Sequence, residues 1–304
     1  MTEATDPRAP IGRMLTAIVT PMSDDGAVDH AALAALATHL VENGHDGLVV
    51  SGTTGEAPTT SDEEKTQILR TVVDAVGDRA CIVAGVGTYA TEHTIHLAKQ
   101  AEQAGADALL VVTPYYSKPT QAGLVAHFTA VADATGLPNV LYDIPGRSAI
   151  PIETPTLQQV AEHERIVAVK DAKADLCAGM EVMATTDLAY YSGDDALNFS
   201  WFSAGAVGAI SVVGHAFGRE YVEMLDAVER GDLVEARQIH IDLVPAVRAI
   251  MRAGSQGAIQ AKATSQLLGV IPSRHLRLPL LPASDDEVSA LREMLLAAGK
   301  DVSE

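Results

Sequence analysis

One lysine of the chain stands where a buried parallel strand would end. Lys170 directly follows the apolar run 166–169, and none of the other six lysines follows four apolar residues in this way. An ammonium group that is partly removed from water loses solvation, so its pKa falls and the neutral amine becomes a nucleophile for a ketone. This position predicts a lysine that forms an imine. A lysine that extends to solvent, or that pairs with Asp171 or Asp143, is the structural alternative.

Polar groups also follow other predicted strands. The segment Gly52-Thr53-Thr54-Gly55-Glu56 offers hydroxyl and backbone N–H groups at a helix start, where a carboxylate could bind, although an ordinary strand-to-helix turn is the alternative. Tyr116 and Tyr142 could relay protons, whereas buried tyrosines are more often core residues with one satisfied hydroxyl. Arg147 could bind a carboxylate through two hydrogen bonds, or it could form a surface ion pair.

Two patterns imitate cofactor or metal sites. Residues 85–90 have the G-x-G-x-x-A spacing of a dinucleotide-binding turn. However, Asp107 begins the next predicted strand, whereas a ribose-binding carboxylate should end it. His93 and His96 share a helical face without a third ligand. We therefore predict neither a nicotinamide cofactor nor a metal site.

Composition restricts the partners of the protein. Forty acidic and twenty-one basic residues give a formal net charge of −19, which disfavours binding to nucleic acid and to anionic membranes. The same field repels small carboxylates, so a local arginine or converging N–H groups must hold such a substrate. We expect neither a signal peptide nor a membrane anchor, because the first ten residues lack an apolar run and no stretch approaches the roughly 20 residues that span a bilayer. Two cysteines, Cys81 and Cys177, are too few for a disulfide framework and favour a reducing, cytoplasmic setting.

Eight short apolar runs, separated by amphipathic stretches, would position these side chains. The runs are rich in Val, Ile and Leu and do not alternate with polar residues, which is typical of parallel strands covered on both faces. The predicted strands are residues 15–20, 47–51, 81–84, 108–113, 140–142, 166–169, 189–191 and 208–212. Asp29 and Thr91 are predicted to cap the starts of two helices that Gly44 and Gly105 end.

Repeated alternation of strands and helices predicts an α/β fold, namely a single (β/α)₈ TIM barrel with additional C-terminal helices. We expect a flexible N-terminal tail at residues 1–13, the barrel at residues 14–231 and a helical C-terminal extension at residues 232–304. A doubly wound open sheet is the alternative. In a barrel the functional side chains follow the C-terminal ends of the strands, which is where the polar segments above are found.

Together these segments resemble the dihydrodipicolinate synthase family, a branch of the N-acetylneuraminate lyase superfamily of class I, pyruvate-dependent aldolases. The resemblance covers about residues 14–268 and depends on seven motifs in order: Thr20-Pro21-Met22, Gly52–Glu56, Thr113–Tyr116, Tyr142–Arg147, Val169-Lys170-Asp171, Ser192–Asp195 and Gly208–Val212. Each motif is weak alone, but their order in barrel register is specific.

The resemblance implies a lyase that forms a Schiff base between Lys170 and pyruvate, with the pyruvate carboxylate held by the backbone N–H groups of Thr53 and Thr54. The resulting enamine would attack the aldehyde of L-aspartate 4-semialdehyde. The adduct would then cyclise by transimination and leave as 4-hydroxy-tetrahydrodipicolinate, a step of lysine and diaminopimelate biosynthesis. No cofactor other than this covalent imine is implied.

The family further implies a proton relay formed by Thr53, Tyr116 and Tyr142, in which Tyr116 reaches into the site of a neighbouring subunit. Gly193 and the carbonyl group of Ile210 would line the pocket. The implied assembly is a homotetramer, a dimer of dimers, with small-molecule substrates and without nucleic-acid or membrane partners.

Arg147 would bind the carboxylate of the second substrate, and it separates this reading from its nearest alternative. Sugar-acid lyases of the superfamily typically lack an arginine there. A pyruvate-dependent aldolase or dehydratase for N-acetylneuraminate or 2-keto-3-deoxygluconate is that alternative. An alternative of another class is a non-catalytic barrel that binds a small carboxylate.

The chain departs from the family pattern at several positions. Asp143 stands where the family usually has Asn, and Asp171 stands where Glu is common. The family's allosteric lysine site corresponds to Ala57, Pro58, Asp62, Lys65, Tyr89 and His93, which replace Ser, Ala, His, His, Asn and Glu, while Tyr115 is kept. A cationic Lys65 and the absence of an acid at His93 weaken binding of a lysine ligand. We therefore expect little or no feedback inhibition by lysine.

Overall fold

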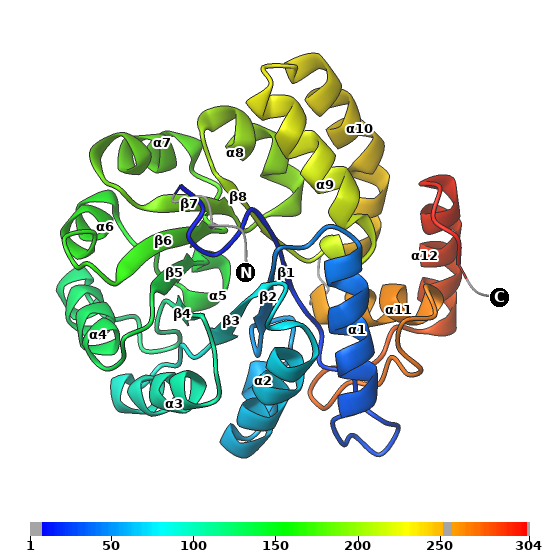
Figure 1. The fold of residues 1–304 in the computed structure, drawn as a ribbon, viewed down its shortest axis with the longest axis horizontal. Coiled ribbons are helices and arrows are strands. Elements are labelled where there is room, and N and C mark those ends of the chain that lie inside the picture. Colours follow the sequence, from blue (N-terminus) through cyan, green and yellow to red (C-terminus); the bar gives the residue numbers. More distant parts are fainter. Residues whose placement is uncertain (1–7, 252–256, 303–304) are drawn as a thin grey trace.

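The computed structural model describes residues 8–251 and 257–302, and its eight parallel strands close into a barrel in the order of the sequence (Figure 1). The strands are β1 (Met14–Ala17), β2 (Gly47–Val50), β3 (Cys81–Gly85), β4 (Ala108–Val112), β5 (Asn139–Asp143), β6 (Ile166–Asp171), β7 (Ala189–Ser192) and β8 (Gly208–Ser211). Each predicted apolar run overlaps one of these strands. The prediction of a TIM barrel is therefore confirmed, and the open sheet is excluded because β1 pairs with β8.

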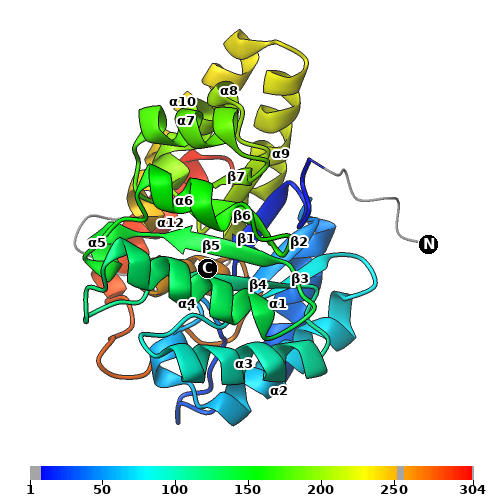
Figure 2. The ribbon, with the colours of Figure 1, turned by 90° about the vertical axis from the view of Figure 1, so that its left-hand side faces the viewer.

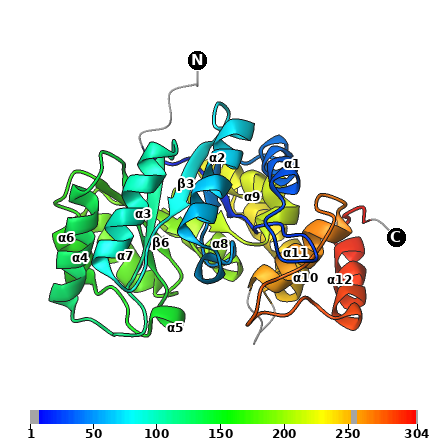
Figure 3. The ribbon, with the colours of Figure 1, turned by 90° about the horizontal axis from the view of Figure 1, so that it is seen from below.

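The helices surround the barrel and continue beyond its last strand. They are α1 (His30–Glu42), α2 (Asp62–Val76), α3 (Thr91–Gln103), α4 (Gln121–Asp133), α5 (Pro145–Ser148), α6 (Thr154–Val160), α7 (Leu176–Thr185), α8 (Asn198–Ala204), α9 (Gly214–Glu229), α10 (Leu233–Ile250), α11 (Gly257–Leu267) and α12 (Asp285–Ala297), with 3₁₀ turns η1 (Ala57–Thr59) and η2 (Asp195–Leu197). Figures 1 and 3 show α10, α11 and α12 together on one side of the barrel, beside α9 and α1.

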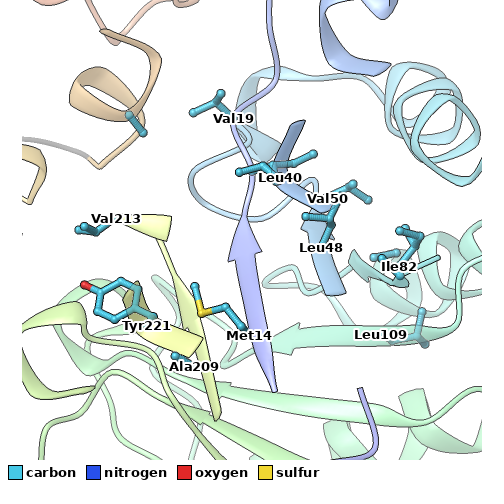
Figure 4. Close-up of a cluster of buried hydrophobic side chains, with 14 of the residues drawn as sticks. Met14, Val19, Leu40, Leu48, Val50, Ile82, Leu109, Ala209, Val213 and Tyr221 are labelled. Carbon is cyan, nitrogen blue, oxygen red and sulfur yellow. The ribbon is translucent and has the colours of Figure 1, made fainter. Parts of the chain in front are cut away.

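Two apolar layers explain why the strands are apolar on both faces. Outward-facing side chains such as Leu48 and Ile82 pack against helical side chains such as Leu40 (Figure 4). Inward-facing side chains form a second buried cluster that includes Val140, Tyr142, Ala168, Tyr191 and Ile210. Because successive side chains of a strand point to opposite faces, Lys170 faces the barrel interior together with Ala168.

The helix caps agree with three of the four predicted residues. The Asp29 carboxylate accepts a hydrogen bond from the N–H group of Ala32, and Gly44 and Gly105 follow their helices with positive φ. The prediction that Thr91 caps α3 is wrong, because the helix has Ala90 at its N-cap and Thr91 is already helical. Thr91 Oγ1 instead contacts Nδ1 of His127 at 2.9 Å, which ties α3 to α4.

The chain before β1 closes the N-terminal end of the barrel. Residues 1–7 of the expected tail lie outside the described residues. Ile11 is fully buried in the inner apolar cluster, and the Gly12 carbonyl accepts a hydrogen bond of 2.9 Å from the Tyr191 hydroxyl. The packed chain thus begins before Met14.

At the other end of the barrel, β5 runs toward α5 (Figure 2). None of the helices in the described ranges is long and apolar enough to cross a membrane.

Candidate active site

Lys170 lies near the C-terminal end of β6 with its side chain inside the barrel. It pairs in register with Tyr142 of β5 and Tyr191 of β7, and only 4% of its surface is exposed. Its Nζ lies 4.3 Å from the centroid of the Tyr142 ring. Burial lowers the pKa of Lys170 to about 8, Asp195 opposes this shift, and the cation of Arg147 adds to it. The amine is therefore far more available as a nucleophile than a solvated lysine.

Tyr142 connects the lysine to the loop that follows β2. The Tyr142 side chain is hydrogen-bonded to the Thr53 side chain, and it is 6% exposed. Burial raises the pKa of Tyr142 to about 12, although Arg147 and Thr53 lower it in part. Its hydroxyl stays protonated at neutral pH, so it can pass protons through a hydrogen bond but does not act as a phenolate. The structure thus brings together Lys170, Tyr142 and Thr53, as predicted.

The loop Gly52–Glu56 crosses the C-terminal end of the barrel and buries Thr54, while Thr53 is half-buried. The Gly55 carbonyl accepts a hydrogen bond of 2.8 Å from Thr20 Oγ1, which fixes the loop to the segment after β1. The 3₁₀ turn η1 follows the loop directly. These contacts make a compact turn whose Thr53 side chain is hydrogen-bonded to Tyr142, the neighbour of Lys170.

The glycines that imitate a dinucleotide-binding turn have a packing role. A Cβ atom on Gly85 would lie 2.4 Å from the Ser51 carbonyl oxygen, and one on Gly87 would lie 2.3 Å from the Val112 nitrogen. Neither distance is sterically possible, so the close approach of neighbouring strands requires glycine at both positions. This explains the spacing without a nucleotide.

Gly193 lies against the lysine at the end of β7. A Cβ atom there would be 3.0 Å from Cγ of Lys170 and 2.9 Å from the Asp171 carbonyl oxygen, which also accepts a 2.7 Å hydrogen bond from the Gly193 N–H. A larger residue would push the lysine side chain aside. Ile210 is fully buried in β8 and belongs to the same inner cluster as Tyr142. Ile210 thus lies on a strand inside the barrel, and Gly193 directly follows the end of β7.

Arg147 and Tyr116 occupy the outer part of the site. Arg147 is exposed on the short helix α5, and its charge lowers the pKa of both Lys170 and Tyr142. Tyr116 is 92% exposed and has a positive φ of 71°. Within one chain Tyr116 therefore does not join Thr53 and Tyr142. Its predicted role requires a second subunit.

Asp195, the last residue of the motif Ser192–Asp195, is a buried carboxylate that orders the end of β8. Asp195 is 2% exposed and accepts hydrogen bonds from the N–H groups of Val212 and Val213, at 2.9 and 3.0 Å, and from the Ser211 hydroxyl. It also raises the pKa of Lys170. Two adjacent acids after a strand were the available signal, since a buried acid needs several donors.

Two further buried acids, Asp143 and Asp171, are the last residues of β5 and β6. Asp143 is fully buried 3.3 Å from Nζ of Lys173, and burial raises the pKa of Asp143 to about 6. Asp171 accepts hydrogen bonds from the Tyr190 hydroxyl at 2.6 Å and from the Lys173 N–H at 2.8 Å. Lys173, and not Lys170, is thus the cation that pairs with Asp143, so the structural alternative for Lys170 does not hold.

The histidines of α3 have protein partners. His93 Nε2 contacts Asp62 Oδ2 at 2.9 Å, and the rings of His93 and His96 are stacked with centroids 6.5 Å apart. In residues 8–251 and 257–302 no three His, Cys, Asp or Glu side chains gather in a way that could hold a metal ion.

A closed barrel with an inward-facing lysine of lowered pKa at the end of a strand, next to a tyrosine, defines the class of lysine-dependent, aldolase-type TIM barrels. Comparison with known proteins identifies the branch of this class. Residues 10–298 match the Dihydrodipicolinate synthetase family, and the chain belongs to this family.

Individual relatives cover nearly the whole chain. A 4-hydroxy-tetrahydrodipicolinate synthase of Kineococcus radiotolerans is 62% identical over 296 residues, which are 97% of this chain and 96% of the relative. The crystal structure of a dihydrodipicolinate synthase of Bacillus anthracis has a TM-score of 0.91 and 39% identity, and the match covers 95% of this chain and 98% of the other. A synthase of Acinetobacter baumannii, solved in complex with pyruvate, has a TM-score of 0.90 and 36% identity, with coverage of 95% and 99%.

Proposed function

We propose that the protein condenses pyruvate with L-aspartate 4-semialdehyde through a Schiff base on Lys170 and releases 4-hydroxy-tetrahydrodipicolinate. The observation that carries this proposal is the inward-facing Lys170, with a pKa of about 8, against the ring of Tyr142. Family membership and the 62% identical relative, which is named for this reaction, support the choice of substrates. The complex of the Acinetobacter baumannii synthase supports pyruvate as the first substrate.

In the first half of the reaction, the neutral amine of Lys170 attacks the ketone carbon of pyruvate. The carbinolamine loses water and becomes a protonated imine, which withdraws electrons from the neighbouring methyl group. Loss of one methyl proton gives the enamine. The N–H groups of Thr53 and Thr54 are proposed to bind the carboxylate, because a small anion needs local donors on a chain with a net charge of −19.

In the second half, the enamine carbon forms a bond to the aldehyde carbon of L-aspartate 4-semialdehyde, and the aldehyde oxygen takes up a proton. The amino group of the adduct then attacks the imine carbon and displaces Lys170. Ring closure by this transimination releases 4-hydroxy-tetrahydrodipicolinate and regenerates the free lysine. The imine is the only electron sink that these reaction steps need, so the proposed reaction uses no further cofactor.

The proton transfers are assigned to a relay of Thr53, Tyr142 and Tyr116. The hydrogen bond between Thr53 and Tyr142 supports the first link, and the 4.3 Å distance from the Tyr142 ring to Lys170 supports its placement beside the reacting nitrogen. A tyrosine with a pKa of about 12 suits a relay because it donates one proton while it accepts another.

Arg147, Gly193 and Ile210 are proposed to bind the substrates. Arg147 would hold the carboxylate of the semialdehyde at the outer end of the pocket, where its exposed guanidinium offers paired donors. Gly193 leaves room for the covalent adduct next to Cγ of Lys170. The Ile210 carbonyl would line the inner wall.

The proposed active form is the homotetramer, a dimer of dimers, that the family resemblance implies, and a relay that needs Tyr116 from a neighbouring subunit requires at least a dimer. The 92% exposure of Tyr116 and the 64% exposure of Tyr89 support an interface on this face. We also propose a cytoplasmic location, which the two free cysteines, Cys81 and Cys177, support.

Borohydride trapping followed by a substrate comparison tests the proposal. Reduction in the presence of pyruvate should leave a stable adduct that peptide mass spectrometry locates on Lys170, and the purified protein should then turn over L-aspartate 4-semialdehyde but not N-acetylneuraminate or 2-keto-3-deoxygluconate. An unmodified lysine would favour a carboxylate-binding barrel. An adduct with turnover of a sugar acid instead would overturn the choice of second substrate.

A further inference from the structure

A buried ion pair connects the helices after the barrel to the loop Gly52–Glu56. Lys262 of α11 is 0% exposed, Glu56 is 1% exposed, and Nζ of Lys262 lies 2.5 Å from Oε1 of Glu56. The two residues are 206 positions apart in the sequence. Neither belongs to the relay or to the substrate-binding groups assigned above.

The C-terminal part of the chain occupies both oxygens of the Glu56 carboxylate. Oε1 accepts from Lys262, and Oε2 accepts a hydrogen bond of 3.0 Å from the N–H group of Arg277. Lys262 also donates to the His275 carbonyl at 2.6 Å. The carboxylate is therefore held in one orientation from two directions.

The side chain of Arg277 in turn holds in place the segment after α11, which carries the Arg277 N–H group. Its guanidinium donates to the carbonyl groups of Gly26 and Thr59, and it forms an ion pair with Glu64 of α2 at 2.5 Å. The contacts tie the segment after α11 to both ends of the η1 region. Glu56 is thus bound to a part of the structure that is itself immobilised.

Glu56 is the last residue of the turn that carries Thr53 and Thr54. Its backbone is left-handed, with φ 58° and ψ 39°, and its N–H donates to the Thr53 carbonyl at 3.2 Å. A residue other than glycine seldom adopts this conformation unless its surroundings impose it. The buried ion pair supplies such a constraint, three residues away from the Thr53 hydroxyl that contacts Tyr142.

The chemical nature of the pair favours a role in positioning. A buried ion pair adds little stability compared with an apolar pair of the same size, because both ions lose their hydration. The helix α11 also buries Ala258, Ala261 and Ala263 completely beside Lys262, so an aliphatic residue would suit packing alone. The ion pair instead fixes orientation, because its hydrogen bonds hold the Glu56 carboxylate, and with it the turn, in one position.

We propose that Lys262 and Glu56 are positioning residues for the proposed reaction: through this pair the C-terminal helices hold the turn in the shape that presents Thr53 and Thr54 to the pyruvate carboxylate. The inference rests on the proposed function. It assigns a role in pyruvate binding to a helix outside the (β/α)₈ unit, and it predicts that loss of the pair affects pyruvate more than the second substrate.

The test compares Lys262→Met, Glu56→Gln and the double variant with wild type in steady-state kinetics. We expect the KM for pyruvate to rise at least about tenfold in each, because small misplacements of binding groups have effects of this size. The KM for L-aspartate 4-semialdehyde should stay within about twofold, since Arg147 is not attached to this turn. Lys300→Met is the matched control, because Lys300 also lies after α10 but pairs with Glu220 of α9.

The double variant keeps the test decisive if a single substitution fails to fold, because it leaves no unpaired buried charge. A folded double variant with the wild-type KM for pyruvate would overturn the inference, as would an equal rise of both KM values. Borohydride trapping of wild type separates this result from the proposed function. If wild type forms no pyruvate adduct on Lys170, the proposed function fails and the inference fails with it. If wild type forms the adduct while the folded double variant keeps its KM, only the inference fails.

Discussion

At the scale of single residues, burial decides what Lys170 can do. Lowering its pKa from 10.5 to about 8 corresponds to roughly 3 kcal/mol of lost preference for the charged form. At pH 7 roughly one lysine in ten is then neutral, whereas a solvated lysine would be neutral in fewer than one molecule in a thousand. The negative charge of Asp195 limits this lowering. Burial and Asp195 together therefore set the pKa of Lys170 near the range of physiological pH.

The rate of imine formation should follow this pKa. Because only the neutral amine attacks pyruvate, trapping by borohydride is expected to accelerate nearly tenfold per pH unit below pH 7 and to level off above about pH 8. The measurement is the initial rate of adduct formation at saturating reductant from pH 6 to pH 10. A rate that keeps rising up to pH 10 would mean that Lys170 is solvated like an ordinary lysine.

Local sequence was enough to predict Lys170 but not Lys262. The first follows an apolar run that identifies its strand and its depth, so burial can be read from its neighbours. The second was missed because its partner Glu56 is 206 residues away, and no local pattern reports such a contact. The available signal was that Lys262 is the one charged residue of α11, since a buried cation requires a partner.

At the scale of elements, the apolar runs predicted every strand because both faces of the barrel wall are buried. The prediction failed where a polar side chain had two possible uses: Thr91 was expected to cap α3 but contacts His127 of α4 instead. Hydroxyl groups bond equally well to a backbone N–H or to a neighbouring helix, and only the tertiary structure decides between them. The boundaries at residues 13 and 231 stay predictions.

The junction of β5 and β6 should make stability depend on pH through Asp143. Its pKa of about 6 in the folded state lies above the ordinary value of 3.8, so the folded protein binds more protons than the unfolded chain between these values. Ionisation of Asp143 therefore lowers the free energy of unfolding as pH rises from 4 to 6. Asn, which the family usually has there, carries no charge and avoids this loss.

We expect Asp143→Asn to gain stability relative to wild type as pH rises, by up to about 2 kcal/mol between pH 4 and pH 7. The pKa of about 6 already includes the favourable charge of Lys173, and in the variant the amide oxygen can still accept from Ile152 N–H. Urea denaturation of both proteins at several pH values measures the difference. A difference that is independent of pH would show that Asp143 is ionised throughout.

At the scale of the whole molecule, the charges around α2 and α3 bear on regulation. Lys65 donates to the Thr60 carbonyl, His93 contacts Asp62, and the rings of Tyr89 and Tyr115 meet edge to face at 5.5 Å. The region therefore presents a cation at residue 65 and has its acid at residue 62 occupied by His93. A dibasic ligand would meet repulsion and few free acceptors.

Free L-lysine is consequently expected to change the initial rate less than twofold at about 10 mM, a concentration at which even a weak site of millimolar affinity would be filled. Rates measured with saturating pyruvate and semialdehyde check this, with D-lysine at the same concentration as the control for ionic effects. Half-maximal inhibition by L-lysine at or below about 10 mM would contradict the expectation.

The proposed role of Tyr116 makes activity depend on assembly. In a single chain its side chain is 92% exposed and its backbone is left-handed, so it does not reach the site of its own chain. If it acts in a neighbouring subunit, a hybrid dimer of a Lys170→Ala chain and a Tyr116→Phe chain carries both substitutions in one site and leaves the other site intact. Each variant alone should lose most of its activity. Subunits mixed under exchange should regain part of it, because a hybrid dimer combines the intact Lys170 of one chain with the intact Tyr116 of the other. Steady-state rates of mixed and separate samples measure the recovery, and no recovery after verified exchange would place Tyr116 in its own chain's site or outside the relay.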